Sequence, residues 1–129
     1  MSTIPLYIAV AVGGALGSVG RFAMMNACGR WWGVEYPYGT LAVNVAGAFA
    51  MGILVGLFAA FASVGQEVRA FFAVGVLGGF TTFSTFSLDM VTLFQRGEVF
   101  AAVVYAAASV LLTLFALYLG LALTRMLAA

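Results

Sequence analysis

Four long apolar stretches, separated by short polar breaks, make up most of this chain. They cover approximately residues 4–25, 38–62, 68–94 and 99–123. Each is as long as, or longer than, the roughly 20 residues that an α-helix needs to cross the hydrocarbon core of a bilayer. The pattern therefore predicts an all-α membrane protein, in which residues 1–129 form a single domain of four transmembrane helices.

The composition agrees with a membrane protein. Of 129 residues, 65% are hydrophobic and 7% are charged, whereas soluble domains average about 25% charged residues. The chain has no histidine, which excludes a histidine-based metal site or proton relay, and Cys28 has no second cysteine to pair with. The net charge of +1 gives no reason to expect a nucleic-acid partner. No catalytic constellation is visible, so we expect no enzyme.

The connections between the stretches are short. Residues 26–37 contain Trp31, Trp32, Tyr36 and Pro37, an aromatic cluster typical of a membrane–water interface. Residues 63–67 and 95–98 are expected to be tight turns.

The arginines are balanced between the two sides of the membrane. Four spans place both termini on one side, together with Arg69 and Arg125, and place Arg30 and Arg96 on the other. Arg21 adds to that other side if its side chain extends out of the first span. Orientation in membranes follows an arginine and lysine bias, and here almost none exists. The balance favours insertion in both orientations and an antiparallel, dual-topology homodimer; a single orientation is the alternative.

Small residues recur at a spacing of four on three of the spans. This spacing lets helix backbones approach closely in lipid, so it predicts tight packing. Four such helices leave little room for a pore, and a transport path would therefore need a second subunit. The residues are Ala9, Gly13 and Gly17, then Ala48, Gly52 and Gly56, then Gly75 and Gly79.

The third span contains an unusual segment. Residues 78–86 read Gly-Gly-Phe-Thr-Thr-Phe-Ser-Thr-Phe. Adjacent glycines loosen a helix, and polar groups at membrane depth are costly and tend to mark a pathway or a binding site. We therefore expect the third helix to be broken at about 78–82.

Hydrogen-bond donors without negative charge lie inside the other spans. Asn44 interrupts an apolar run of the second span, and Tyr105, Ser109 and Thr113 are spaced by four on the fourth, which places them on one helix face. Hydroxyl and amide donors, with the electropositive edges of phenylalanine rings, can replace water around a small anion. A cation path would instead show carboxylates or carbonyls.

Each of these groups also has an ordinary structural explanation. Ser109 and Thr113 can donate to the carbonyl four residues back, Asn44 can bond to a neighbouring helix, and Tyr105 can lie in an interfacial belt. The phenylalanines can simply pack, and Arg21 can be a membrane-surface anchor. It is the combination of the groups that favours an anion path.

Three motifs resemble the bacterial fluoride channels, the Fluc or CrcB family. They are Gly-Arg-Phe at residues 20–22, Gly-Thr-Leu-Ala-Val-Asn-Val-Ala-Gly at 39–47, and Gly-Gly-Phe-Thr-Thr-Phe-Ser-Thr-Phe-Ser at 78–87. The third is highly specific, and all three occur in the family's order over nearly the whole chain.

The resemblance implies passive fluoride export across the cell (inner) membrane by an antiparallel homodimer with two pores. It also implies a structural Na⁺ at the dimer interface, which is not transported and is held by the backbone carbonyls of Gly78 and Thr81.

The resemblance also implies roles for side chains. Phe83 and Phe86 would turn ring edges to the anion, and Arg21 would lie in a vestibule. One departure is Asp89, where the family pattern has glutamate. The remaining pore residues would be Asn44, Ser84, Thr85, Tyr105, Ser109 and Thr113.

Two other classes remain as alternatives. Small multidrug exporters also have four spans and dual topology, but they depend on a buried glutamate in the first helix, which this chain lacks. A non-transporting membrane subunit would use its polar residues only for packing.

Overall fold

The computed structural model describes residues 2–128, and every regular element in that range is helical. Four stretches of the described residues are long and apolar enough to cross a membrane, which confirms the predicted all-α class with four spans. The elements are α1 (Ile4–Trp32), α2 (Tyr38–Ala60), α3 (Gln66–Arg69), the π-helical η1 (Ala70–Leu77), α4 (Gly78–Phe80), α5 (Phe83–Gln95) and α6 (Val99–Ala128).

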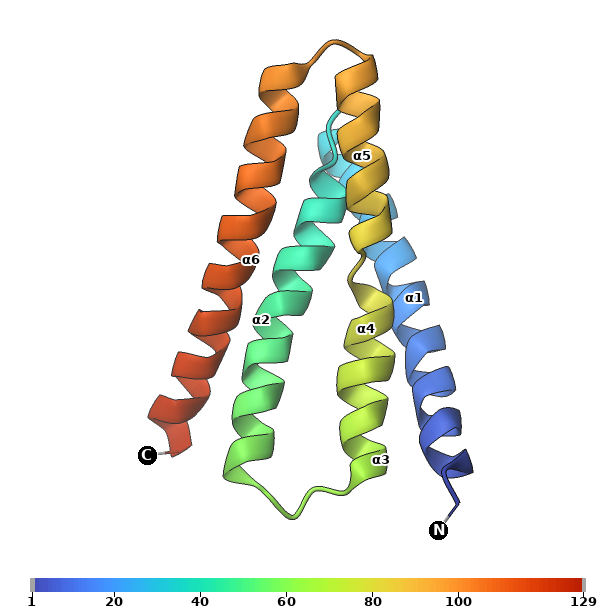
Figure 1. Ribbon diagram of the computed structural model, residues 1–129, viewed down its shortest axis with the longest axis vertical. Helices are drawn as coiled ribbons and strands as arrows, with labels where there is room; N and C mark the ends of the chain where they lie inside the picture. Colours follow the sequence, from blue (N-terminus) through green and yellow to red (C-terminus); the bar gives the residue numbers. More distant parts are fainter. Residues whose placement is uncertain (1, 129) are drawn as a thin grey trace.

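The helices pack as two pairs. One pair is α2 with α6, and the other is α1 with the third span, which runs from α3 through η1 and α4 to α5. Both termini lie at one end of the bundle, together with the α2–α3 connection (Figure 1). The α1–α2 and α5–α6 connections lie at the opposite end, called here the far end.

The helix ends differ from the predicted ones. The first helix was expected to end at about residue 25, but α1 continues to Trp32, so Trp31 and Trp32 are helical. Hydrophobicity marks where the membrane ends, whereas a helix ends where its backbone must turn, here at Gly33 with a positive φ of 80°. The other helix ends also differ: α6 runs past residue 123 to Ala128, and α2 stops at Ala60 instead of 62.

The third span is broken, as predicted, but over a shorter segment than 78–82. Only Thr81 and Thr82 have extended backbone, and Gly78–Phe80 remains helical. Of the glycine pair, Gly79 serves the contact with α1: a Cβ atom on it would lie 2.7 Å from the Gly14 carbonyl oxygen. Close packing, and not helix breaking, therefore accounts for Gly79.

The predicted small-residue spacing is confirmed by the packing. A Cβ atom on Gly13 or Gly17 would collide with the carbonyl oxygens of Phe71 or Val76 in the third span. In the other pair, a Cβ atom on Gly52 would collide with the carbonyl oxygen of Leu117 in α6. These glycines bring the backbones of each helix pair into direct contact.

Candidate functional site

Thr82 organises the break in the third span. Its Oγ1 accepts a hydrogen bond from the Thr85 backbone N–H at 3.1 Å and so caps the start of α5. The same hydroxyl lies 3.2 Å from Ser84 Oγ and donates to Thr85 Oγ1 at 3.2 Å. Thr82 was not among the predicted site residues, although a threonine directly before the first residue of a helix is a capping signal.

Asn44 of α2 binds both backbone groups of Thr82, the N–H and the carbonyl. Asn44 Oδ1 accepts from the Thr82 N–H at 2.8 Å, and Asn44 Nδ2 donates to the Thr82 carbonyl at 3.0 Å. The side-chain amide thus replaces the partners that a continuous helix would have given to Thr82. The interhelical role considered for Asn44 is present, and it joins α2 directly to the break.

These two arrangements release backbone oxygens in the third span. In a continuous helix the Thr82 N–H would donate to the Gly78 carbonyl, and the Thr85 N–H to the Thr81 carbonyl. Both donors are used elsewhere. Within residues 2–128, the carbonyl oxygens of Gly78 and Thr81 accept no hydrogen bond.

Arg21 lies beside the break. Its Nε donates to the Gly79 carbonyl at 3.0 Å, and the residue is partly buried. The hydrogen bond holds the guanidinium against the third span, next to the break.

A cavity of about 370 Å³ opens beside the break, between α2, α5 and α6. It brings together six of the predicted site residues. No carboxylate lines it, so it presents donors and ring edges without fixed negative charge. The predicted residues on its wall are Asn44, Thr81, Phe83, Phe86, Ser109 and Thr113.

The two phenylalanines lie together at the start of α5. Their ring centroids are 5.4 Å apart with an interplanar angle of 34°. Phe83 is 78% exposed in the single chain, whereas Phe86 is partly buried and packs against Leu93, Ala102 and Tyr105. Packing thus explains Phe86 in part, but it does not explain the exposed ring of Phe83.

Ser109 and Thr113, the two α6 hydroxyl residues at the cavity, differ in whether the hydroxyl already donates a hydrogen bond. Thr113 Oγ1 donates to the Ser109 carbonyl at 2.6 Å, as the ordinary structural explanation expected. Ser109 Oγ is buried and has no partner among the described residues. The Ser109 hydroxyl is therefore an unused donor beneath the cavity wall, whereas Thr113 contributes mainly oxygen lone pairs.

Tyr105 lies outside this cavity. It is only 7% exposed, which rules out an interfacial belt position, and its hydroxyl donates to Asp89 Oδ2 at 2.9 Å. Its ring lies 5.2 Å from Phe86, centroid to centroid. Ser84 and Thr85 lie on α5 beside Thr82, also outside the cavity wall.

Comparison with known proteins places the chain in a family. Residues 8–121 match the family model described as CrcB-like protein, Camphor Resistance (CrcB). A protein of Rhodospirillum centenum named fluoride-specific ion channel FluC is 52% identical over 93% of this chain and 95% of its own length. A relative with the same name from Chelativorans sp. is 52% identical over 90% of this chain and 93% of its own length. Another from Nitrobacter winogradskyi is 48% identical over 92% of this chain and 94% of its own length.

The matched region includes α2, the third span with its break, and most of the first and fourth spans. With this coverage and identity, the chain, a multi-pass membrane protein, belongs to the CrcB family.

Proposed function

We propose that this chain is a fluoride-selective ion channel that lets fluoride leave the cell passively and so lowers its toxicity. The observation that carries the proposal is the cavity at the break, which combines the Asn44 amide, the free Ser109 hydroxyl and two phenylalanine rings without any carboxylate. The printed names of the relatives support fluoride as the anion.

The chemistry of the wall suits a small, strongly hydrated anion. Fluoride gives up its water only if other donors replace it, and the second N–H of Asn44 is such a donor. The unpaired Ser109 hydroxyl would become another when its side chain rotates toward the cavity. The edges of the Phe83 and Phe86 rings carry partial positive charge. A larger anion such as chloride would be excluded by its size, and no covalent step is needed.

A structural Na⁺ is part of the proposal. The carbonyl oxygens of Gly78 and Thr81 lack hydrogen-bond donors among residues 2–128, and they are the residues that would hold the ion. The described residues contain no cluster of histidine, cysteine and carboxylate side chains that could hold a metal, so backbone oxygens are the suitable ligands. A bound Na⁺ would supply positive charge near the break.

The proposal also includes an antiparallel homodimer of dual topology. The single chain does not enclose the cavity, and Phe83 on its wall is largely exposed, so a second copy is needed to enclose a path. The near-equal distribution of arginines between the two sides supports insertion in both orientations.

Ion flux from liposomes tests the function. We expect purified protein to release trapped fluoride but neither chloride nor a lipophilic cation. Transport of the lipophilic cation would support the multidrug exporter, and the absence of all three fluxes from well-folded protein would support a non-transporting subunit. Either result would contradict the channel.

The orientation needs a separate measurement. Reporter proteins fused to the C-terminus, one active only inside the cell and one only outside, should both give a signal. A signal from one side alone would contradict dual topology while leaving the channel function untouched.

A further inference from the structure

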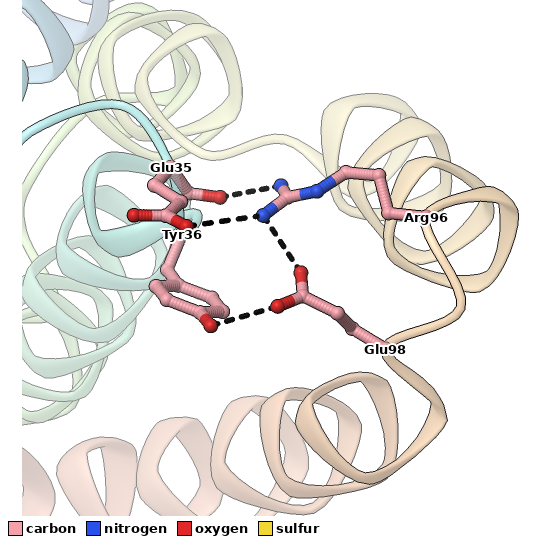
Figure 2. Close-up of polar contacts among 4 residues, drawn as sticks. All are labelled: Glu35, Tyr36, Arg96 and Glu98. Atoms are coloured by element: carbon pink, nitrogen blue, oxygen red, sulfur yellow. Dashed lines mark hydrogen bonds and ion pairs between the residues drawn. The ribbon is translucent and has the colours of Figure 1, made fainter.

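Side chains from two distant connections meet at the far end of the bundle (Figure 2). Arg96, after α5, places Nη2 2.7 Å from Glu98 Oε2 and 3.8 Å from Glu35 Oε1. Its Nη1 donates to the Glu35 carbonyl at 2.6 Å. One guanidinium thus joins the α1–α2 loop to the α5–α6 turn.

Tyr36 closes the same group. Its hydroxyl donates to Glu98 Oε1 at 2.8 Å, and the Arg96 guanidinium lies 5.6 Å from the centre of its ring. We call these four residues, Glu35, Tyr36, Arg96 and Glu98, the far-end clasp. The Arg96 and Glu98 side chains are only 36% and 30% exposed, so their interaction is less screened than that of a fully exposed pair.

Half-helix α5 needs such an anchor. It carries both phenylalanines of the candidate path, but Leu93 is its only buried residue. The break separates it from α4, so the helix before it does not hold it in place. At its start, α5 is held by Asn44 through Thr82. At its other end, the far-end clasp supplies the polar contacts.

A buried cluster links the clasp to the candidate path. Tyr36 packs against the buried cluster of Leu93, Ala102 and Tyr105, and Phe86 packs against the same cluster. A movement of the loop that carries Tyr36 would therefore reach the ring of Phe86 through direct side-chain contacts.

A second contact runs along α5. Asp89 and Arg96 line one small cavity of about 70 Å³ together with Glu35, and Asp89 accepts the hydrogen bond of Tyr105. The orientation of α5 therefore sets both the position of Asp89 and the position of its two phenylalanines.

We propose that Arg96 is a positioning residue for conduction, which acts through the far-end clasp to fix the far end of α5 and thereby the rings of Phe83 and Phe86. This inference rests on the proposed channel function. Arg96 does not act as a free cation that attracts fluoride, because two carboxylates already face its guanidinium.

The test compares charge-matched variants of the full-length protein. Arg96→Gln opens the clasp, and Arg96→Lys keeps the charge but loses the planar fork that reaches two carboxylates and a carbonyl. Tyr36→Phe removes only the hydroxyl. Arg30→Gln is the control, because Arg30 is exposed in the last turn of α1 and has no hydrogen bond or ion pair among the described residues.

Two readouts are needed, namely the initial rate of fluoride release from liposomes and backbone hydrogen exchange of residues 83–95. We expect Arg96→Gln to lower the rate of fluoride release about five- to tenfold. Loss of the clasp should change the ratio between the conducting position of α5 and a displaced position by a factor of this order. Hydrogen exchange in α5 should become faster. Arg96→Lys should behave similarly, Tyr36→Phe more mildly, and Arg30→Gln like the wild type.

Each contrary result has a distinct meaning. If Arg96→Lys keeps the wild-type rate while Arg96→Gln loses it, Arg96 acts through its charge and the positioning role is wrong. Unchanged rates and unchanged exchange in Arg96→Gln and Tyr36→Phe would also overturn the inference. A wild type that releases no fluoride would overturn the proposed function itself. If Arg96→Gln does not fold, Tyr36→Phe decides by the same two readouts.

Discussion

Asn44 and Thr82 form a paired contact in which one side-chain amide satisfies both backbone groups of the other residue. The two hydrogen bonds measure 2.8 and 3.0 Å and join two residues that are 38 positions apart in the sequence. This contact ends one half-helix and orients the next, so the break in the third span is fixed by α2. Asn44 therefore shapes the candidate path even before any contact with an anion is considered.

Replacing Asn44 should impair both the break and conduction. Asn44→Ala leaves the Thr82 N–H and carbonyl without partners, each at a cost of about 1–3 kcal/mol. A shift of this size changes a conformational equilibrium roughly five- to 150-fold. We expect a lower melting temperature and a strong loss of fluoride flux, whereas Asn26→Ala, at an exposed position of α1, should change neither. Normal flux in Asn44→Ala would leave Asn44 with a packing role only.

The phenylalanine rings should matter for flux more than for folding. Phe83→Ile and Phe86→Ile keep an apolar side chain but remove the ring edge. Losing about 1.4 kcal/mol of anion stabilisation would slow conduction about tenfold, while the protein still purifies as a folded species. Phe94→Ile is the matched control on the same half-helix, with a ring that is 48% exposed and outside the cavity. If both variants conduct normally, the rings have no role in anion binding.

The sequence predicted the spans, the break and the glycine contacts because each depends on local pattern. Length and hydrophobicity identify a membrane helix, and a spacing of four places Gly13 and Gly17 on one face. The extent of α1 was not predictable in this way, since residues 26–32 are less apolar yet contain nothing that ends a helix before Gly33.

Contacts between residues far apart in the sequence could not be predicted from local pattern. Two adjacent threonines, Thr81 and Thr82, look alike in sequence, and only the position of Asn44 decides which one is held. The far-end clasp joins Glu35 to Arg96, which are 61 residues apart. Such pairings depend on how helices are placed in space, and single residues do not encode that placement.

Gly47 should be intolerant of even one methyl group. A Cβ atom there would collide with the Thr81 side chain and crowd the Phe80 ring. Overpacking of this kind typically costs about 1–3 kcal/mol, so Gly47→Ala should lower the melting temperature and the flux. Gly14→Ala is the control, since the nearest atom to its Cβ would be the Gly75 carbonyl oxygen at 4.0 Å. Equal melting temperatures for the two variants would contradict the close contact at the break.

Removing sodium should destabilise the protein if the carbonyls of Gly78 and Thr81 hold Na⁺. A ligand present at 100 times its dissociation constant stabilises the folded state by about 2.7 kcal/mol. We expect the melting temperature to fall when Na⁺ is replaced by a large organic cation at the same ionic strength, and to rise again when Na⁺ is restored. A melting temperature that is independent of the cation would remove Na⁺ from the proposal.

The far-end clasp should fail in strong alkali. The hydrogen bond to Glu98 and the charge of that carboxylate raise the pKa of Tyr36, with smaller contributions from burial and from Glu35, while Arg96 opposes them. Because the folded-state pKa lies above the unfolded value of about 10, the stabilisation is complete below that pH and is lost as the pH rises through the folded pKa. Ultraviolet titration should show one phenol of the wild type ionising at higher pH than it does in Glu98→Gln, and Tyr36→Phe should lack that transition. If Glu98→Gln leaves the transition where it is, the hydrogen bond does not control Tyr36.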